Sequence, residues 1–150
     1  MIKTFRGLLE DGGQDRIRLG TIKGKVGYKI VKFQIMVGAL ATGSDRTNGV
    51  FIWKTEQSTI STSAITPDFN DPSLLAAAIT VWDNTQPNLS SLSVIFDNQI
   101  FNQDIYVTNT ETIATGTCNY YIELEVVELS DMGAEYTTIK DMRTQGPAGY

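Results

Sequence analysis

The sequence predicts an all-β protein: an antiparallel β-sandwich, jelly-roll-like, with a short C-terminal helix. Runs of alternating apolar and polar residues, rich in β-branched and aromatic types, recur along the chain. Turn-forming residues separate these runs at intervals of roughly 8–15 residues, which leaves room for about eight strands and keeps a barrel as the alternative to the sandwich. The chain has 150 residues, 41% of them hydrophobic, which suffices for one domain with a real core. We expect a single domain over 1–143 and a flexible tail over 144–150.

The clearest strand is predicted over 28–37. Its alternation is clean from Lys32 to Val37, as in a strand with one buried face. The break in alternation at Ile30-Val31 predicts a β-bulge. Further strands are predicted over 16–19, 49–55 and 119–129.

One segment in the middle of the chain is ambiguous. The run 74–82 begins with helix-forming residues and ends with strand-forming ones. Because its surroundings are β, we favour a strand with a close-packed stretch of small residues.

The runs 93–96 and 100–108 flank the polar triplet 97–99, which predicts a hairpin with a short turn.

One helix is predicted, at about 130–143. Ser130 or Asp131 can cap its start. Met132, Tyr136 and Ile139 recur at helical spacing and would form one apolar stripe. This closing helix would pack on the sandwich as an appendage or serve as a docking element.

The composition removes most catalytic chemistry. The sequence contains no His, which is the commonest general base and a common metal ligand. We therefore expect no enzyme, no catalytic residues, no cofactor and no metal site. The single Cys, Cys118, fits a small buried residue better than a reactive thiol. No apolar run reaches the length of a membrane span, and the first residues contain no apolar signal core.

Two clusters of oxygen-bearing side chains have an alternative interpretation as chemical sites. The oxygen side chains within 68–71 are of the type that calcium binds, but residues of this type also form turns. Two of Glu123, Glu125 and Glu128 could serve as glycosidase carboxylates. Alternating Glu on the exposed face of a strand is more simply explained by solvation, so we favour neither site.

Charge is divided unevenly between the two parts of the chain. Residues 1–54 hold ten of the twelve bases and four acids, whereas residues 55–150 hold two bases and thirteen acids. Three interpretations are open: a nucleic-acid contact through the basic part, interleaving of both parts in one fold, or contact between oppositely charged faces of two molecules. We favour interleaving.

Two predicted strands carry complementary charges, Lys within 25–32 and Glu within 123–128. If they are neighbours in one chain, the opposite charges help to set their register. If they are not, they are candidate contacts between subunits. These strands and the other basic segments make up the candidate interface: Lys3, Arg6, Arg16, Arg18, Lys25, Lys29, Lys32, Glu123, Glu125, Glu128, Lys140 and Arg143.

Seven blocks of the sequence carry a resemblance. They are TFRG (4–7), DGGQDRI (11–17), GKVGYKIVKFQI (24–35), LLAAA (74–78), IFDNQIFNQDIYVT (95–108), NYYIELE (119–125) and TIKDMR (138–143). In these blocks the chain resembles a family of small virion structural proteins of marine tailed bacteriophages, including phages of cyanobacteria and pelagic bacteria. The block at 95–108 is the most specific. The resemblance implies a structural component of the virion, assembled in the host cytoplasm, with no catalytic residues to transfer.

Within that class, a capsid decoration or cement protein is the leading hypothesis. Such a protein would bind the major capsid protein and copies of itself, as a homo-oligomer in the particle, without a membrane and without nucleic acid as its main partner. The basic segment 1–32 and the predicted helix are the candidate docking elements.

Two other functions are kept as alternatives. One is a tail- or fibre-associated module that binds a receptor glycan, an idea that rests on fold-level analogy. It requires Trp53, Trp82 and Tyr120 to be exposed and clustered. The other is a contact with DNA inside the head through the basic half.

Overall fold

A computed structural model describes residues 1–19, 26–38, 45–62, 64–83, 88–96, 99–112 and 116–129. Over these residues the chain forms eight strands and no helix. The strands are β1 (Ile2–Leu9), β2 (Gln14–Ile17), β3 (Val26–Val37), β4 (Arg46–Trp53), β5 (Leu74–Asp83), β6 (Asn88–Ile95), β7 (Ile105–Glu111) and β8 (Cys118–Glu128).

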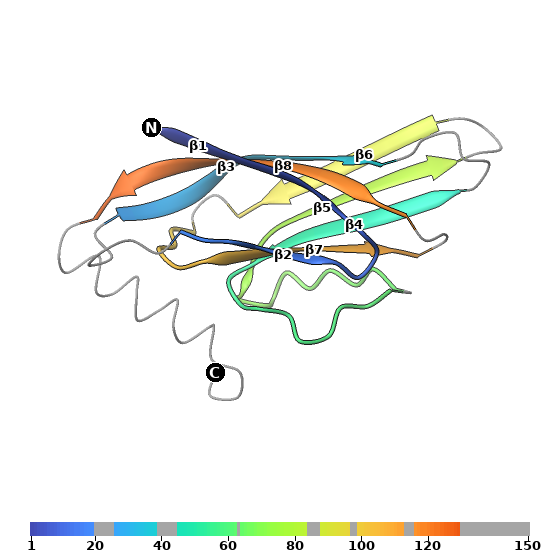
Figure 1. The fold of residues 1–150 in the computed structure, drawn as a ribbon, viewed down its shortest axis with the longest axis horizontal. Coiled ribbons are helices and arrows are strands. Elements are labelled where there is room, and N and C mark those ends of the chain that lie inside the picture. Colours follow the sequence, from blue (N-terminus) through green and yellow to red (C-terminus); the bar gives the residue numbers. More distant parts are fainter. Residues whose placement is uncertain are drawn as a thin grey trace.

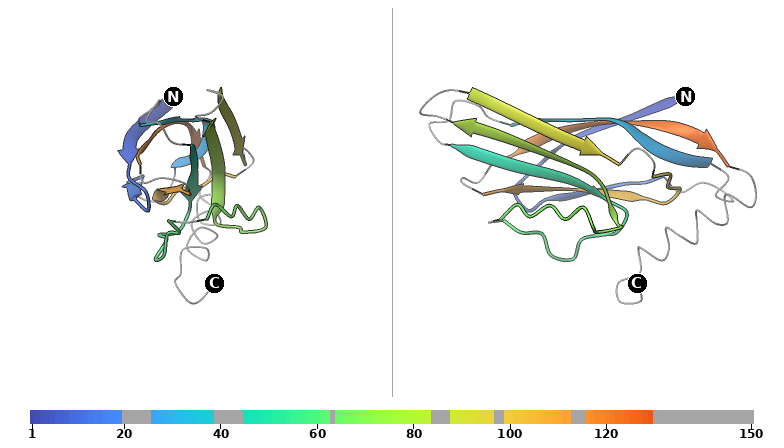
Figure 2. Two further views of the ribbon diagram at one scale, coloured as in Figure 1. Left: turned by 90° about the vertical axis from the view of Figure 1, so that its right-hand side faces the viewer. Right: turned by 180° about the vertical axis from the view of Figure 1, so that it is seen from behind.

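The strands form two antiparallel sheets, as the sequence predicts (Figure 1). One sheet has the order β1-β8-β3 and the other the order β2-β7-β4-β5-β6. In the larger sheet, β4, β5 and β6 follow one another as neighbours, and β7 returns to lie beside β4, which is a Greek key. The end-on view in Figure 2 shows the two sheets as layers of a sandwich.

The two oppositely charged parts of the chain interleave. Each of β1 to β4 pairs only with strands from β5 to β8, so every strand of the basic part lies beside a strand of the acidic part. This confirms the interpretation that the basic and acidic parts interleave within one fold.

One apolar core lies between the sheets. Phe33 of β3 and Ile122 and Leu124 of β8 pack in the same cluster as Ile52 of β4 and Val107 of β7. On β3 and β8 the buried and exposed residues alternate as predicted, because a strand with one face on the core alternates its side chains between core and solvent.

Strand β5 has an almost continuous apolar run because both of its faces are covered. Ala76 and Ala78 face the core, while Ala77 packs on the other face with Phe51 and Ile65. Residues 54–62 and 64–73 lie over this outer face of the five-stranded sheet (Figure 1). The preference for a strand over 74–82 is therefore confirmed, and a run buried on both faces explains why its pattern was ambiguous.

The predicted β-bulge in β3 is confirmed, whereas the predicted hairpin between the runs 93–96 and 100–108 is wrong. The β3–β8 register shifts between Ile30 and Lys32, so Val31 is the extra residue. By contrast β6 and β7 do not pair: β4 and β5 lie between them. Phe101, 1% exposed, forms an isolated bridge with Tyr28 of β3 instead, and this contact takes the chain across to the other sheet before β7 begins.

The predicted helix and tail, at 130–150, lie outside the described residues. In the described part of the chain no helix has the length and apolar character needed to cross a membrane.

Candidate functional site

The two complementary strands are neighbours within one chain. In the β3–β8 register Lys29 lies opposite Glu125 and Lys32 opposite Glu123. The Nζ–Oε2 distances are 3.5 Å and 4.0 Å. Positions three apart would face opposite sides of a regular strand, so the bulge at Val31 is what brings both lysines to the same face. The charges therefore form a cross-strand ladder that supports the register of the sheet.

The ladder occupies one end of the exposed outer face of the three-stranded sheet. Strand β1 contributes residues that lie opposite the two glutamates and, farther along the strand, Arg6 and Leu8. At the other end Leu8 and Met36 flank Asn119 and are 56% and 64% exposed. We call this surface the ladder face; its residues are Ile2, Thr4, Arg6, Leu8, Lys29, Lys32, Gln34, Met36, Asn119, Tyr121, Glu123 and Glu125.

Tyr121 lies in the middle of the ladder face, between Asn119 and Glu123. Its hydroxyl donates a hydrogen bond to Glu123 at 2.9 Å, and this bond raises the pKa of Tyr121. The Lys32 ammonium lies 6.0 Å from the centre of its ring. Tyr120 and Tyr121 are adjacent in a strand and must face opposite sides, so only Tyr120 belongs to the core.

The other predicted interface residues are dispersed. Arg16 of β2 pairs with Asp104 at 2.6 Å on the other sheet, and Lys3 lies over the Tyr28 ring at 5.5 Å from its centre. Arg18 and Glu128 are exposed and stand apart from the ladder pairs. Lys25, Lys140 and Arg143 lie outside the described residues.

A buried ion pair, which the sequence analysis missed, links β4 to β7. Arg46 donates to both carboxylate oxygens of Glu111 at 3.1 Å, and their side chains are 3% and 0% exposed. Arg46 also donates to the Thr117 carbonyl at 3.4 Å, and a side chain at Gly116 would collide with the guanidinium. The signal was present in the alternation, because Arg46 has the phase of Ile52 on its strand, facing the core.

Amide and carboxylate groups complete a polar layer around this pair. The Asn48 amide donates to Asn109 at 3.3 Å, and the Asn109 amide donates to the Leu9 carbonyl at 3.2 Å. The backbone N–H of Glu111 donates to Asp11 at 2.9 Å. The layer joins β1, β4 and β7 at one end of the core, which is a structural role.

A second polar contact holds the two sheets together. The Tyr120 hydroxyl of β8 donates to Asp15 of β2 at 2.8 Å. Gly7 makes room for this ring, because a side chain there would come within 2.8 Å of it. Burial and then the bond to Asp15 raise the pKa of Tyr120 well above its usual value.

Cys118 is an inert thiol. It is fully buried, and burial raises its pKa to about 12. A thiol attacks as the thiolate, so a raised pKa makes this sulfur a poor nucleophile. The expectation of a small buried residue is confirmed.

The three rings named for glycan binding form no common patch. Trp53 lies at the end of β4, and Trp82 pairs in register with Arg46 at the start of the same strand. Tyr120 is buried between the sheets, 5% exposed. Asp68 and Asp71, the candidate calcium ligands, accept hydrogen bonds from nearby backbone N–H groups in turns. In the described segments no three acidic or cysteine side chains converge as a metal site requires.

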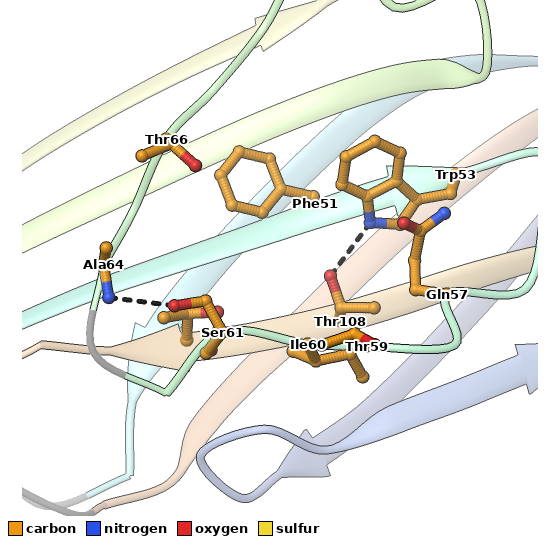
Figure 3. Close-up of a pocket in the computed structure, with 10 residues that line it drawn as sticks. Phe51, Trp53, Gln57, Thr59, Ile60, Ser61, Ala64, Thr66 and Thr108 are labelled. Atoms are coloured by element: carbon orange, nitrogen blue, oxygen red, sulfur yellow. Dashed lines mark hydrogen bonds between the residues drawn. The ribbon is translucent and has the colours of Figure 1, made fainter.

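Trp53 instead lines a cleft of about 190 Å³ on the outer face of the five-stranded sheet (Figure 3). Its floor is formed by Phe51, Thr108 and Thr110 of β4 and β7, and residues within 57–61 and 64–66 form its wall. The molecule thus has two distinct surfaces, the ladder face on one sheet and this cleft on the other.

Comparisons with protein-family models and with curated protein sequences find no match to this chain.

Proposed function

We propose that this chain is a non-enzymatic structural protein of a bacteriophage particle, and that it decorates or cements the head by binding the major capsid protein and copies of itself. The sequence resemblance supports the class of protein. In this proposal the sandwich is jelly-roll-like and the C-terminal helix at about 130–143 assists docking.

The observation that carries the proposal is the ladder face. Interfaces combine apolar and polar groups, and this face offers exposed Leu8 and Met36 at one end and paired charges at the other. Lys29 and Lys32 are already paired with glutamates, so the face presents both signs of charge at fixed positions. Such an arrangement favours one orientation of a protein partner over others.

The same pairing counts against DNA as the main partner. Phosphate binding needs a surface of uncompensated positive charge. On the ladder face two of the three basic side chains lie within 4.0 Å of a carboxylate, and Arg16 on β2 is likewise paired with Asp104.

The test is an add-back experiment with particles that lack the protein. Leu8→Asp and Met36→Asp place a charge in the apolar part of the ladder face and are expected to weaken particle binding about tenfold or more. Leu92→Asp is the matched control, because Leu92 is also an exposed strand residue, 69% exposed, but lies on the other sheet. Wild-type binding by the first two variants, or equal loss in the control, would contradict docking through this face.

A further inference from the structure

We propose that the cleft beside Trp53 binds a single neutral sugar residue. The site lies on the opposite side of the sandwich from the ladder face and does not depend on the proposed role in the particle (Figures 1 and 3).

The aromatic wall of the cleft is held in a fixed orientation. The Trp53 indole N–H donates to the Thr108 hydroxyl at 2.9 Å. The Phe51 ring packs beside it, with ring centres 5.7 Å apart and planes tilted by 43°. Phe51 is buried, whereas Trp53 is half-buried and keeps part of its ring accessible from the cleft. A ring fixed in this way can stack on a ligand without first losing rotational freedom.

The opposite wall is tied to the sheet by hydrogen bonds. Gln57 exchanges two backbone–side-chain bonds with Gln14 of β2, at 2.8 Å and 3.2 Å. The Thr110 hydroxyl donates to the Ser61 carbonyl at 2.7 Å. These bonds hold residues 57–61 against β2 and β7, so this wall of the cleft is formed before a ligand arrives.

One polar atom in the wall is oriented and available. The Gln57 side-chain amide nitrogen donates to the Thr55 carbonyl and to the Thr55 hydroxyl, both at 3.0 Å. Fixing the nitrogen also fixes the amide oxygen, which accepts no hydrogen bond within the described part of the chain. This oxygen can accept a hydrogen bond from a ligand hydroxyl.

The lining selects the class of ligand. The described residues that line the cleft are aromatic, aliphatic, hydroxyl or amide types, and none is charged. A phosphate or carboxylate would lose its hydration without an opposite charge, which is unfavourable. A sugar ring offers C–H groups to the negative face of an indole and hydroxyls to Gln57 and the threonines. Pockets for drug-sized ligands start at roughly 300 Å³, so a cleft of about 190 Å³ fits one ring rather than a long chain.

The experiment is a titration of the full chain with methyl glycosides of glucose, galactose, mannose and N-acetylglucosamine, followed by tryptophan fluorescence. The Trp82→Phe variant serves as background, because Trp53 is then the only tryptophan and reports on the cleft. We expect one glycoside to give a saturable change with a dissociation constant of about 1–10 mM. Gln57→Ala is expected to weaken binding about three- to tenfold with unchanged fluorescence in the free protein.

The result has two further checks. Ligand-observed NMR on Trp53→Ala should show binding abolished, with the fold verified by circular dichroism. The proposal would be overturned if none of the four glycosides saturated the protein up to about 50 mM. It would also be overturned if binding survived in both Gln57→Ala and Trp53→Ala, or if the protein preferred glucose 6-phosphate to the neutral sugars. Trp53→Ala should still bind particles, so failure of the sugar site and failure of the capsid role are separately visible.

Discussion

The molecule contains two sets of cross-strand charged pairs, and they differ in burial. On the five-stranded sheet Arg46 and Glu111 are almost completely buried and joined by two hydrogen bonds. On the three-stranded sheet Lys29–Glu125 and Lys32–Glu123 are half exposed, with longer separations. Separating a buried pair leaves a desolvated charge, whereas an exposed partner is re-solvated by water. The first set therefore contributes strongly to stability, whereas the second supports the register of its sheet only weakly and remains accessible at the surface.

The strongest test of this difference is removal of one buried partner. Glu111→Ala removes the carboxylate that accepts two hydrogen bonds from the buried Arg46 guanidinium, and it is expected to lower the free energy of unfolding by about 3–5 kcal/mol. Urea denaturation measures the effect. The double variant Arg46→Met/Glu111→Leu should recover much of the loss, because an apolar pair of similar size removes both charges. A loss below about 1 kcal/mol for Glu111→Ala would mean that this buried pair contributes no more to the free energy of unfolding than an exposed pair does.

The Tyr120–Asp15 bond is intermediate in burial and should be intermediate in effect. Tyr120→Phe removes only the hydroxyl that donates to the carboxylate at 2.8 Å. We expect a loss of about 1.5–3 kcal/mol, the range for a hydrogen bond to a charged group, measured by the same denaturation. Tyr121→Phe is the matched control, since its hydroxyl bonds to Glu123 on the exposed face. An equal loss in both variants would show that burial does not separate them.

Alkaline pH should destabilise the fold through Cys118. In the unfolded chain the thiol ionises near its ordinary pKa of 9.0, whereas the folded protein retains the proton until about pH 12. The folded state binds more protons in this window, so stability is complete below pH 9 and falls as pH rises toward 12. The expected slope is about 1.4 kcal/mol per pH unit for this group.

Denaturation midpoints measured between pH 8 and pH 11 in the wild type and in Cys118→Ala isolate this contribution. The variant should lose stability less steeply, although Tyr120, whose pKa is also raised, keeps some alkaline dependence in both proteins. Identical slopes would mean that the thiol is not protected from ionisation.

The smallest effect is expected on the ladder. Lys32→Ala separates a pair at 4.0 Å and should cost about 0.2–1 kcal/mol. Added salt should reduce the difference from wild type further, because exposed charges are screened. A cost of several kcal/mol that salt does not change would make the ladder a structural element and weaken its assignment to docking.

The sequence predicts strands better than it predicts their partners. Alternation located β3 and β8, and a single break in alternation located the bulge at Val31. The polar triplet at 97–99 indicated a change of direction, but a local signal does not say which strand comes next. In the structure Phe101 bridges to Tyr28, a residue far away in the sequence, and β7 then pairs with β4 rather than with β6.

The sequence likewise predicted only part of the candidate site, because a local pattern does not show which strands meet. Charge pattern marked Lys29, Lys32 and the glutamates as complementary but left open whether they pair within one chain, and the β3–β8 register decides this. Arg46 and Glu111 were missed because each stands alone in its segment, and only the strand register shows that they meet. The cleft at Trp53 depends on how residues 57–61 and 64–66 lie over the sheet, which no local pattern specifies.

The most direct test of the docking proposal is a cryo-EM map of the intact particle in which copies of this chain are counted and oriented. The account predicts many copies in a regular lattice on the head, with Leu8, Met36 and the ladder face against the capsid protein or a neighbouring copy. A few copies at the portal or tail, or a lattice in which the ladder face points to solvent, would contradict it.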